Sequence, residues 1–144
     1  MPYYIKRSTK AKSDNARLIA KLDRIFSLYI RLRDSAPFHH QAFRCISCGQ
    51  VKPFEQADCG HFFSRRHMAT RFDEDNCWCE CRSCNRFSAD HLHAYESNLK
   101  SKIGEERFSL LEWRAHQTKK WHPFELQQLI AHYTEEVRKM TENK

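Results

Sequence analysis

Two pairs of closely spaced cysteines are the strongest constraint on how this chain can fold. Cys45 and Cys48 form one C-x2-C motif, Cys81 and Cys84 form a second, and 32 residues separate the two motifs. Four thiolates can close a tetrahedral shell around Zn²⁺ and leave no open position, which is typical of a structural site. Because the separation exceeds the about 15–20 residues usual in zinc ribbons, we expect zinc to clamp both ends of a large insert.

The remaining cysteines are Cys59, Cys77 and Cys79, and a total of seven does not suit a disulfide framework. The alternation of Cys77, Cys79 and Cys81 predicts strand positions on one face, with Cys77 and Cys79 in the core. A redox-sensing role for Cys59 or Cys77 is an alternative, although nothing in the sequence marks these thiols as activated.

The net charge of +7 is concentrated near the N-terminus. Residues 1–36 carry nine basic and three acidic side chains, residues 37–100 carry eight of each, and residues 101–144 carry eight basic and seven acidic ones. A basic arm beside a neutral segment suits a chain that binds phosphates with one part and performs another function with the rest. The alternative is that the basic residues only keep the helix solvated. With neither a secretory signal nor an apolar stretch of about 20 residues, we expect a cytoplasmic protein without a membrane partner.

Hydrophobic periodicity predicts helices on either side of an irregular central segment. An amphipathic helix is expected over residues 14–35, capped by Asp14 and ended by Pro37. Further helices are predicted over residues 89–103, ended by Gly104, over residues 105–116, and from Pro123 onwards. The three tryptophans are expected in the core; they are Trp78, Trp113 and Trp121.

Candidate catalytic residues lie in or just after the segment that the cysteines enclose. Asp58 offers a carboxylate oxygen and Asn85, directly after Cys84, offers an amide oxygen, and such oxygen ligands suit Mg²⁺ or Mn²⁺. His61 can be neutral at pH 7 and accept a proton from water. Asn76 could orient the His61 ring through its side-chain oxygen. Phosphodiester cleavage needs such a base near a water and a cation near the phosphate.

The spacing of Asp58 and His61 raises a geometric difficulty, because residues three apart on a regular strand point to opposite faces. Gly60 therefore predicts a bend or bulge between them. Taken singly, an Asp-x-x-His motif is usually a surface pair, and Asn85 alone would be a helix N-cap. Their order within the two cysteine motifs favours a nuclease.

Arginines in the intervening loop are candidate DNA-binding residues. They are interpreted as phosphate clamps, with ordinary surface solubility as the alternative, and they are Arg65, Arg66 and Arg71.

These motifs resemble a known group of nucleases. The order C-x2-C, Asp-x-x-His, Asn, C-x2-C-Asn resembles the HNH or His-Me finger endonucleases, in the variant whose last His is Asn, and its layout is similar to the endonuclease VII resolvases. The segments "DCGHFFSRR", "TRFDEDN" and "CRSCNRFSADHLHAYESNLKSKIG" look like the phage NinG/Rap recombination endonuclease family. The resemblance covers about residues 22–104.

The resemblance implies that Asp58 and Asn85 bind the catalytic metal and that His61 is the general base. It also implies that the four cysteines of the C-x2-C motifs bind zinc. The substrates it implies are branched recombination intermediates, such as Holliday junctions or D-loops. Ser88 stands where the resolvases carry a further carboxylate, and Cys59, Cys77 and Cys79 replace smaller or aliphatic residues.

The sequence therefore predicts a metal-dependent DNA endonuclease with an α+β fold in one domain, residues 1–144. The expected organisation is a basic arm and helix (1–36), a zinc-stapled ββα-metal (HNH-like) core (37–90) and a helical cover (91–144). A homodimer would supply two sites for cutting two strands, and a phage-encoded protein would lie in the host cell cytoplasm. The alternative is a non-catalytic, zinc-containing adaptor that binds nucleic acid.

Overall fold

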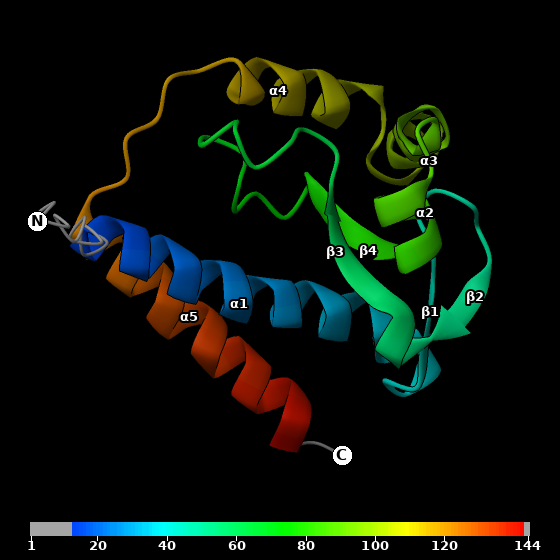
Figure 1. The fold of residues 1–144 in the computed structure, drawn as a ribbon, viewed down its shortest axis with the longest axis horizontal. Helices are drawn as coiled ribbons and strands as arrows, with labels where there is room; N and C mark the ends of the chain where they lie inside the picture. The colour runs from blue at the N-terminus through cyan, green and yellow to red at the C-terminus, as the bar shows by residue number, and fades with distance from the viewer. Residues whose placement is uncertain (1–12, 143–144) are drawn as a thin grey trace, which may run out of the picture.

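Two long helices form one layer of the structure, a computed structural model that describes residues 13–142. The predicted basic arm therefore lies outside the described residues, apart from Ser13. Helix α1 (Asp14–Ser35) and helix α5 (Pro123–Glu142) lie side by side, and α1 also contacts the strands (Figure 1). Helix α1 is capped by Ser13, whose Oγ accepts a hydrogen bond from the Ala16 amide at 3.2 Å, so the prediction of Asp14 as the cap was wrong.

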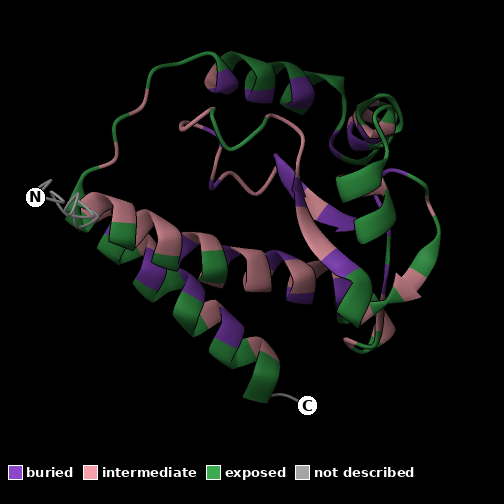
Figure 2. Cartoon of the chain, in the orientation of Figure 1, coloured by how far each residue is buried: buried purple, intermediate pink, exposed green. Residues whose placement is uncertain are grey.

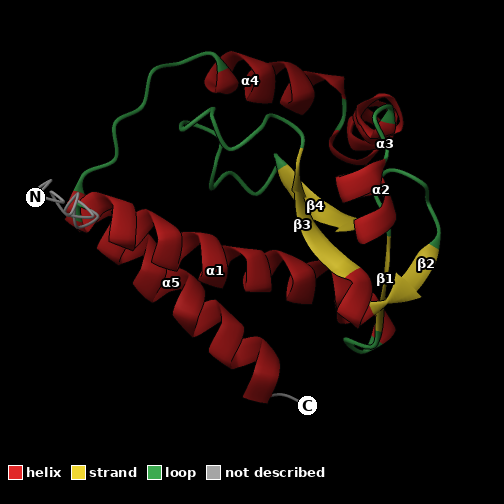
Figure 3. Ribbon diagram, viewed as in Figure 1, coloured by secondary structure: helices red, strands yellow, loops and turns green. Residues whose placement is uncertain are grey.

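Two short antiparallel hairpins make up the sheet structure. Strands β1 (Ala42–Arg44) and β2 (Val51–Pro53) form the first, and strands β3 (Ala57–His61) and β4 (Cys77–Cys81) form the second (Figure 3). Short 3₁₀ turns at Ala36–Phe38 and Phe54–Gln56 precede β1 and β3.

Three shorter helices follow β4 along the chain. They are α2 (Arg82–Phe87), α3 (His91–Ile103) and α4 (Glu105–Ala115). Gly104 ends α3 with a φ of +86°, which confirms the glycine stop predicted there, because L side chains rarely adopt this backbone region.

The buried residues, which are coloured purple along the helices and strands in Figure 2, form three clusters. The first joins α1 to α5, where the Phe26 and Tyr133 rings meet edge to face at a centroid distance of 5.0 Å. The second joins α3 to α4 around Tyr95 and Leu111. The third lies under the cysteine motifs around Phe43 and includes Cys79. The last of these clusters is small, so this region has little apolar burial of its own.

The mixed helix and small-sheet architecture confirms the predicted α+β class. The apolar faces of α1 and α5 pack against each other within the chain. Trp113 was predicted to be a core residue, but it lies 64% exposed on α4 because the helix turns Phe108 and Leu111 inward instead. None of the described helices is long and apolar enough to span a membrane.

Candidate functional site

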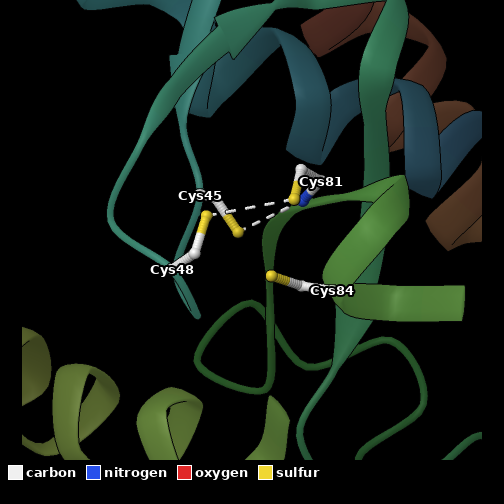
Figure 4. A group of neighbouring side chains, drawn as sticks. All are labelled: Cys45, Cys48, Cys81 and Cys84. Atoms are coloured by element: carbon white, nitrogen blue, oxygen red, sulfur yellow. Dashed lines mark hydrogen bonds between the residues drawn. The ribbon is translucent and has the colours of Figure 1, made fainter. Parts of the chain in front are cut away.

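The four cysteines of the C-x2-C motifs converge on one point (Figure 4). Cys45 and Cys48 come from the turn between β1 and β2, Cys81 ends β4, and Cys84 lies in α2. Their sulfur atoms all lie within 4.8 Å of one another, with Cys48 Sγ 4.0 Å from Cys81 Sγ. The cluster could hold a structural metal such as zinc, because four sulfur atoms are a complete tetrahedral ligand set.

The local backbone brings the first two cysteines together. Gly49 follows them with a φ of +73°, and its amide donates to the Cys45 carbonyl at 2.9 Å, which closes the turn. Burial raises the pKa of the Cys84 thiol, and hydrogen bonding to Cys81 raises it further. Four thiolates in this space would therefore need a cation to balance their charge.

A cleft of about 580 Å³ lies beside this cluster, between α1, β3, the loop after β3, and helices α2 and α3. Four of the predicted site residues line it, and they are Asp58, His61, Arg65 and Asn85. The structure thus brings together a carboxylate, an imidazole, an amide and a guanidinium from three separate parts of the chain.

The path of β3 explains how Asp58 and His61 reach the same cleft. Every residue of β3 pairs with one residue of β4, from Ala57 opposite Cys81 to His61 opposite Cys77. Of the bend or bulge predicted at Gly60, the bulge is therefore absent. In the described part of the chain β3 pairs with β4 alone. Its other edge carries no strand there, so side chains from both faces can border a cleft along that edge.

Gly60 has a different function from the one predicted. A Cβ atom at this position would lie 2.7 Å from Glu80 Oε1 and 2.9 Å from Glu80 Cβ. Glycine is therefore required because the buried Glu80 side chain crosses over the strand at this point.

The His61 ring is held by the backbone of the loop that follows. His61 Nε2 lies 2.9 Å from the Arg71 carbonyl oxygen, which can only accept a hydrogen bond, so Nε2 carries the proton. In the neutral ring the lone pair is then on Nδ1, the nitrogen that can accept a proton. Burial lowers the pKa of His61 below its ordinary value of 6.5, even though the bond to Arg71 acts in the opposite direction.

Asp58 and Asn85 are adjacent, as a shared metal site requires. Asn85 Nδ2 donates to Asp58 Oδ2 at 3.0 Å, and Arg86 donates to both carboxylate oxygens at 2.8 and 2.9 Å. Burial alone would raise the pKa of Asp58, but the hydrogen bonds from Arg86 and Asn85 outweigh it and lower the pKa. The carboxylate is therefore ionised at neutral pH, with both of its oxygens bonded to Arg86.

Asn76 does not orient the His61 ring, so the role predicted for it was wrong. Its side chain is fully buried, accepts from the Phe63 amide at 2.8 Å, and donates to the Phe63 and Thr70 carbonyls at 2.9 and 3.1 Å. Asn76 therefore fixes the loop between β3 and β4, while the Arg71 carbonyl holds the ring.

The three predicted arginines divide into different environments. Arg71 donates to Asp23 on α1 at 2.9 and 2.5 Å and its side chain is 18% exposed, so it is already paired within the fold. Arg65 Nη1 lies 3.9 Å from the same Asp23 carboxylate, but its side chain is 62% exposed and lines the cleft. Arg66 is exposed but is not among the cleft-lining residues.

Sequence reasoning missed three further polar residues in or under the cleft. Arg86 binds Asp58, and His91 Nδ1 lies 2.6 Å from Oε2 of the fully buried Glu80, which also accepts from Ser47. A glutamate between two strand cysteines gave no signal of burial. Its burial depends on partners that come from distant parts of the sequence.

The fold and site define an α+β protein with a four-cysteine cluster beside a polar cleft. The comparisons with known proteins support the NinG part of the resemblance drawn from the motifs. The chain belongs to the family described as the bacteriophage lambda NinG protein, whose family model matches residues 4–143.

Two curated relatives illustrate the similarity. The NinG protein of Escherichia phage 933W is 28% identical over 121 residues, which cover 83% of this chain and 56% of that protein. The NinG protein of Escherichia phage lambda is 28% identical over 121 residues, covering 83% of this chain and 55% of that protein. The chain thus spans about half the length of these relatives. No solved structure matches the chain significantly.

Proposed function

We propose that this chain is a metal-dependent DNA endonuclease of the HNH type that hydrolyses phosphodiester bonds in branched recombination intermediates. The observation that carries the proposal is the cleft in which an ionised carboxylate, an amide and an imidazole with its Nδ1 lone pair lie together. The order β3, β4, α2 agrees with a ββα-metal core. The NinG family membership and its motif resemblance to recombination nucleases support branched DNA as the substrate.

His61 is proposed to take the proton from the attacking water. Its Nε2–H bond to the Arg71 carbonyl fixes the tautomer, and the same bond fixes the direction of the ring. Because burial keeps the imidazole neutral at pH 7, the base is ready before substrate binds.

Asp58 and Asn85 are proposed to hold Mg²⁺ or Mn²⁺, for which hard oxygen ligands are suitable. The bound ion would supply positive charge at the scissile phosphate. Arg86 at present occupies both oxygens of Asp58, and its side chain is 53% exposed. It would have to leave the carboxylate when a cation binds, and it could then contact a phosphate oxygen at the mouth of the cleft.

Zinc in the four-cysteine cluster is proposed to position this site. Cys84 precedes Asn85 directly in α2, a helix of six residues, and the apolar cluster beneath it is small. A helix this short is marginal alone, so a metal that anchors its first turn would keep Asn85 and Arg86 beside Asp58.

The direct test incubates the purified protein with a four-way junction, a linear duplex and single-stranded DNA, each with and without Mg²⁺. We expect cleavage that requires the metal and is fastest on the junction. Binding of all three without any cleavage would contradict the nuclease proposal and support the alternative of a non-catalytic adaptor.

The arginines provide a prediction that separates DNA contact from folding. Arg65→Ala should weaken DNA binding and reduce the log–log salt slope by about 0.9, the value for one phosphate contact, without changing the melting temperature. Arg71→Ala should instead lower the free energy of unfolding by about 1–3 kcal/mol, because Asp23 loses both of its hydrogen bonds from Arg71 and keeps only the longer contact with Arg65. Salt-dependent binding and thermal melts measure both, with the exposed Arg66→Ala as the matched control. If Arg65→Ala and Arg66→Ala weaken DNA binding equally, Arg65 does not make a specific contact with a DNA phosphate in the cleft.

The pH dependence of cleavage follows from the state of His61. Only the neutral ring can accept a proton, and the pKa of His61 is lowered from 6.5 by burial. The cleavage rate should therefore be retained as the pH falls to 6.5 and should decline only below it. Single-turnover rates between about pH 4.5 and 8, in reductant and saturating Mg²⁺, measure the midpoint. A midpoint above 6.5 would contradict the role given to the buried ring.

A further inference from the structure

A second group of metal-ligating side chains lies on one face of the β3–β4 hairpin. Cys59 and His61 are two residues apart on β3, and Cys77 pairs directly with His61 across the hairpin, so all three side chains share that face. Their ligand atoms all lie within 4.8 Å of one another. Asp58 and Glu80 belong to the opposite face, so this group is separate from the proposed Mg²⁺ ligands.

The distances suit a tetrahedral metal ion. Zinc–sulfur and zinc–nitrogen bonds of about 2.3 and 2.0–2.1 Å place neighbouring ligand atoms roughly 3.4–3.8 Å apart. In the second group, as in the four-cysteine cluster, no two ligand atoms are more than 4.8 Å apart. Small side-chain movements would therefore bring Cys59, His61 and Cys77 to bonding distance of one ion.

The chemistry of the three ligands determines which metal they would take. Two thiolates and an imidazole favour soft or borderline ions such as Zn²⁺ over Mg²⁺. Cys77 is fully buried, whereas Cys59 and His61 line the cleft. A fourth ligand can thus come from the cleft, as water or as an oxygen of bound DNA.

We propose that Cys59, His61 and Cys77 form a second zinc site, distinct from the four-cysteine cluster, and that zinc bound there stops His61 from acting as a base. Binding releases the two thiol protons to solvent and forms two metal–thiolate bonds and one metal–imidazole bond. The site itself is independent of the proposed function, whereas the inhibition rests on it.

Either ring nitrogen leads to the same loss of function. If Nδ1 binds the ion, its lone pair is no longer available to a proton. If Nε2 binds the ion, it gives up its bond to the Arg71 carbonyl and its proton moves to Nδ1, since a neutral imidazole keeps one proton. In both cases His61 has no nitrogen left that can accept a proton from water.

Zinc counting tests the site without any DNA. Purified protein in a thiol-free phosphine reductant is equilibrated with excess Zn²⁺, passed through a desalting column, and assayed for zinc per chain. We expect two ions in the wild type, two in Cys79→Ala, and one in the double variant Cys59→Ala Cys77→Ala. Cys79 is the matched control because it is a buried cysteine on the same strand and outside the group.

The single variant Cys59→Ala provides a second test that does not disturb a fully buried residue. Calorimetric titration with Zn²⁺ should show the second site weakened at least about tenfold. One zinc ion in the wild type, or two in the double variant, would overturn the proposed site.

The inhibition is tested by adding Zn²⁺ to the Mg²⁺-dependent cleavage reaction. Wild-type cleavage should fall at least about a hundredfold once the second ion binds, as for loss of a general base. The Cys59→Ala variant, compared with its own rate without zinc, should stay within a few-fold. Unchanged cleavage at two ions per wild-type chain would overturn the inhibition. If the protein never cleaves DNA, the proposed nuclease function is wrong. The zinc count per chain would still show whether the second zinc site exists.

Discussion

The His61→Ala variant should cleave junction DNA about 10²–10⁴ times more slowly than the wild type, the usual effect of removing a general base. DNA binding should be preserved, because the base matters in the transition state and little in the ground state. The fold should also survive, since the side chain contributes one hydrogen bond to the Arg71 carbonyl and no ligand to the four-cysteine cluster. Single-turnover cleavage at equal bound fractions measures the effect.

Two comparisons make this result specific. The exposed His93 on α3 lies outside the cleft, and His93→Ala should cleave at the wild-type rate. Asp58→Ala and Asn85→Ala should be inactive because they bind Mg²⁺ poorly, and high Mg²⁺ should partly restore Asn85→Ala. A His61→Ala enzyme that cuts within a few-fold of the wild type would show that His61 is not the base.

Cys45→Ser should remove the bound zinc and unfold the segment from β1 to α2. Apparent zinc-binding free energies of about 10–16 kcal/mol in small zinc domains are comparable to the about 5–15 kcal/mol that stabilise a typical protein. The apolar cluster around Phe43 contains few side chains and includes the cysteines themselves, so it cannot replace the metal.

Elemental analysis and amide hydrogen exchange measure the two consequences. The amides of β3 and β4 should lose protection, while α1 and α5, which pack on each other, should keep more of theirs. Cys79→Ala is the control, because Cys79 is buried in the same cluster without being a candidate ligand there. A folded Cys45→Ser protein that carries no metal and keeps the wild-type exchange pattern would rule out a structural ion.

The helices could be predicted closely because their signals are local. Residues 14–35 and the start at Pro123 agree with α1 and α5, since helical spacing, a stop at Gly104 and an N1 proline act within a few residues of where they occur. The strands were harder to place, because β1 and β2 have only three residues each.

The sequence predicted which residues line the candidate site better than it predicted which groups those residues bond to. Asp58, His61 and Asn85 line the same cleft, although β3 lacks the bulge that their spacing had led us to expect. The partners of Arg71 and Asn76 could not be predicted, because Asp23 lies 48 residues from Arg71 and Asn76 bonds to a loop whose path is set by packing. Arg86 and Glu80 were missed for the same reason, since the residues near them in the sequence do not indicate which groups they bond to.

Arg71 links His61, the proposed base, to helix α1, and it does so through two different groups. Its carbonyl holds the His61 ring, and its guanidinium is fixed to Asp23 on α1. Asp23 also lines the cleft, so a change at position 23 would disturb the direction of the imidazole as well as the wall of the cleft. Within the family, positions 23 and 71 should consequently change together during evolution: a lineage that loses the aspartate should also replace the arginine, or re-anchor the loop by another pair.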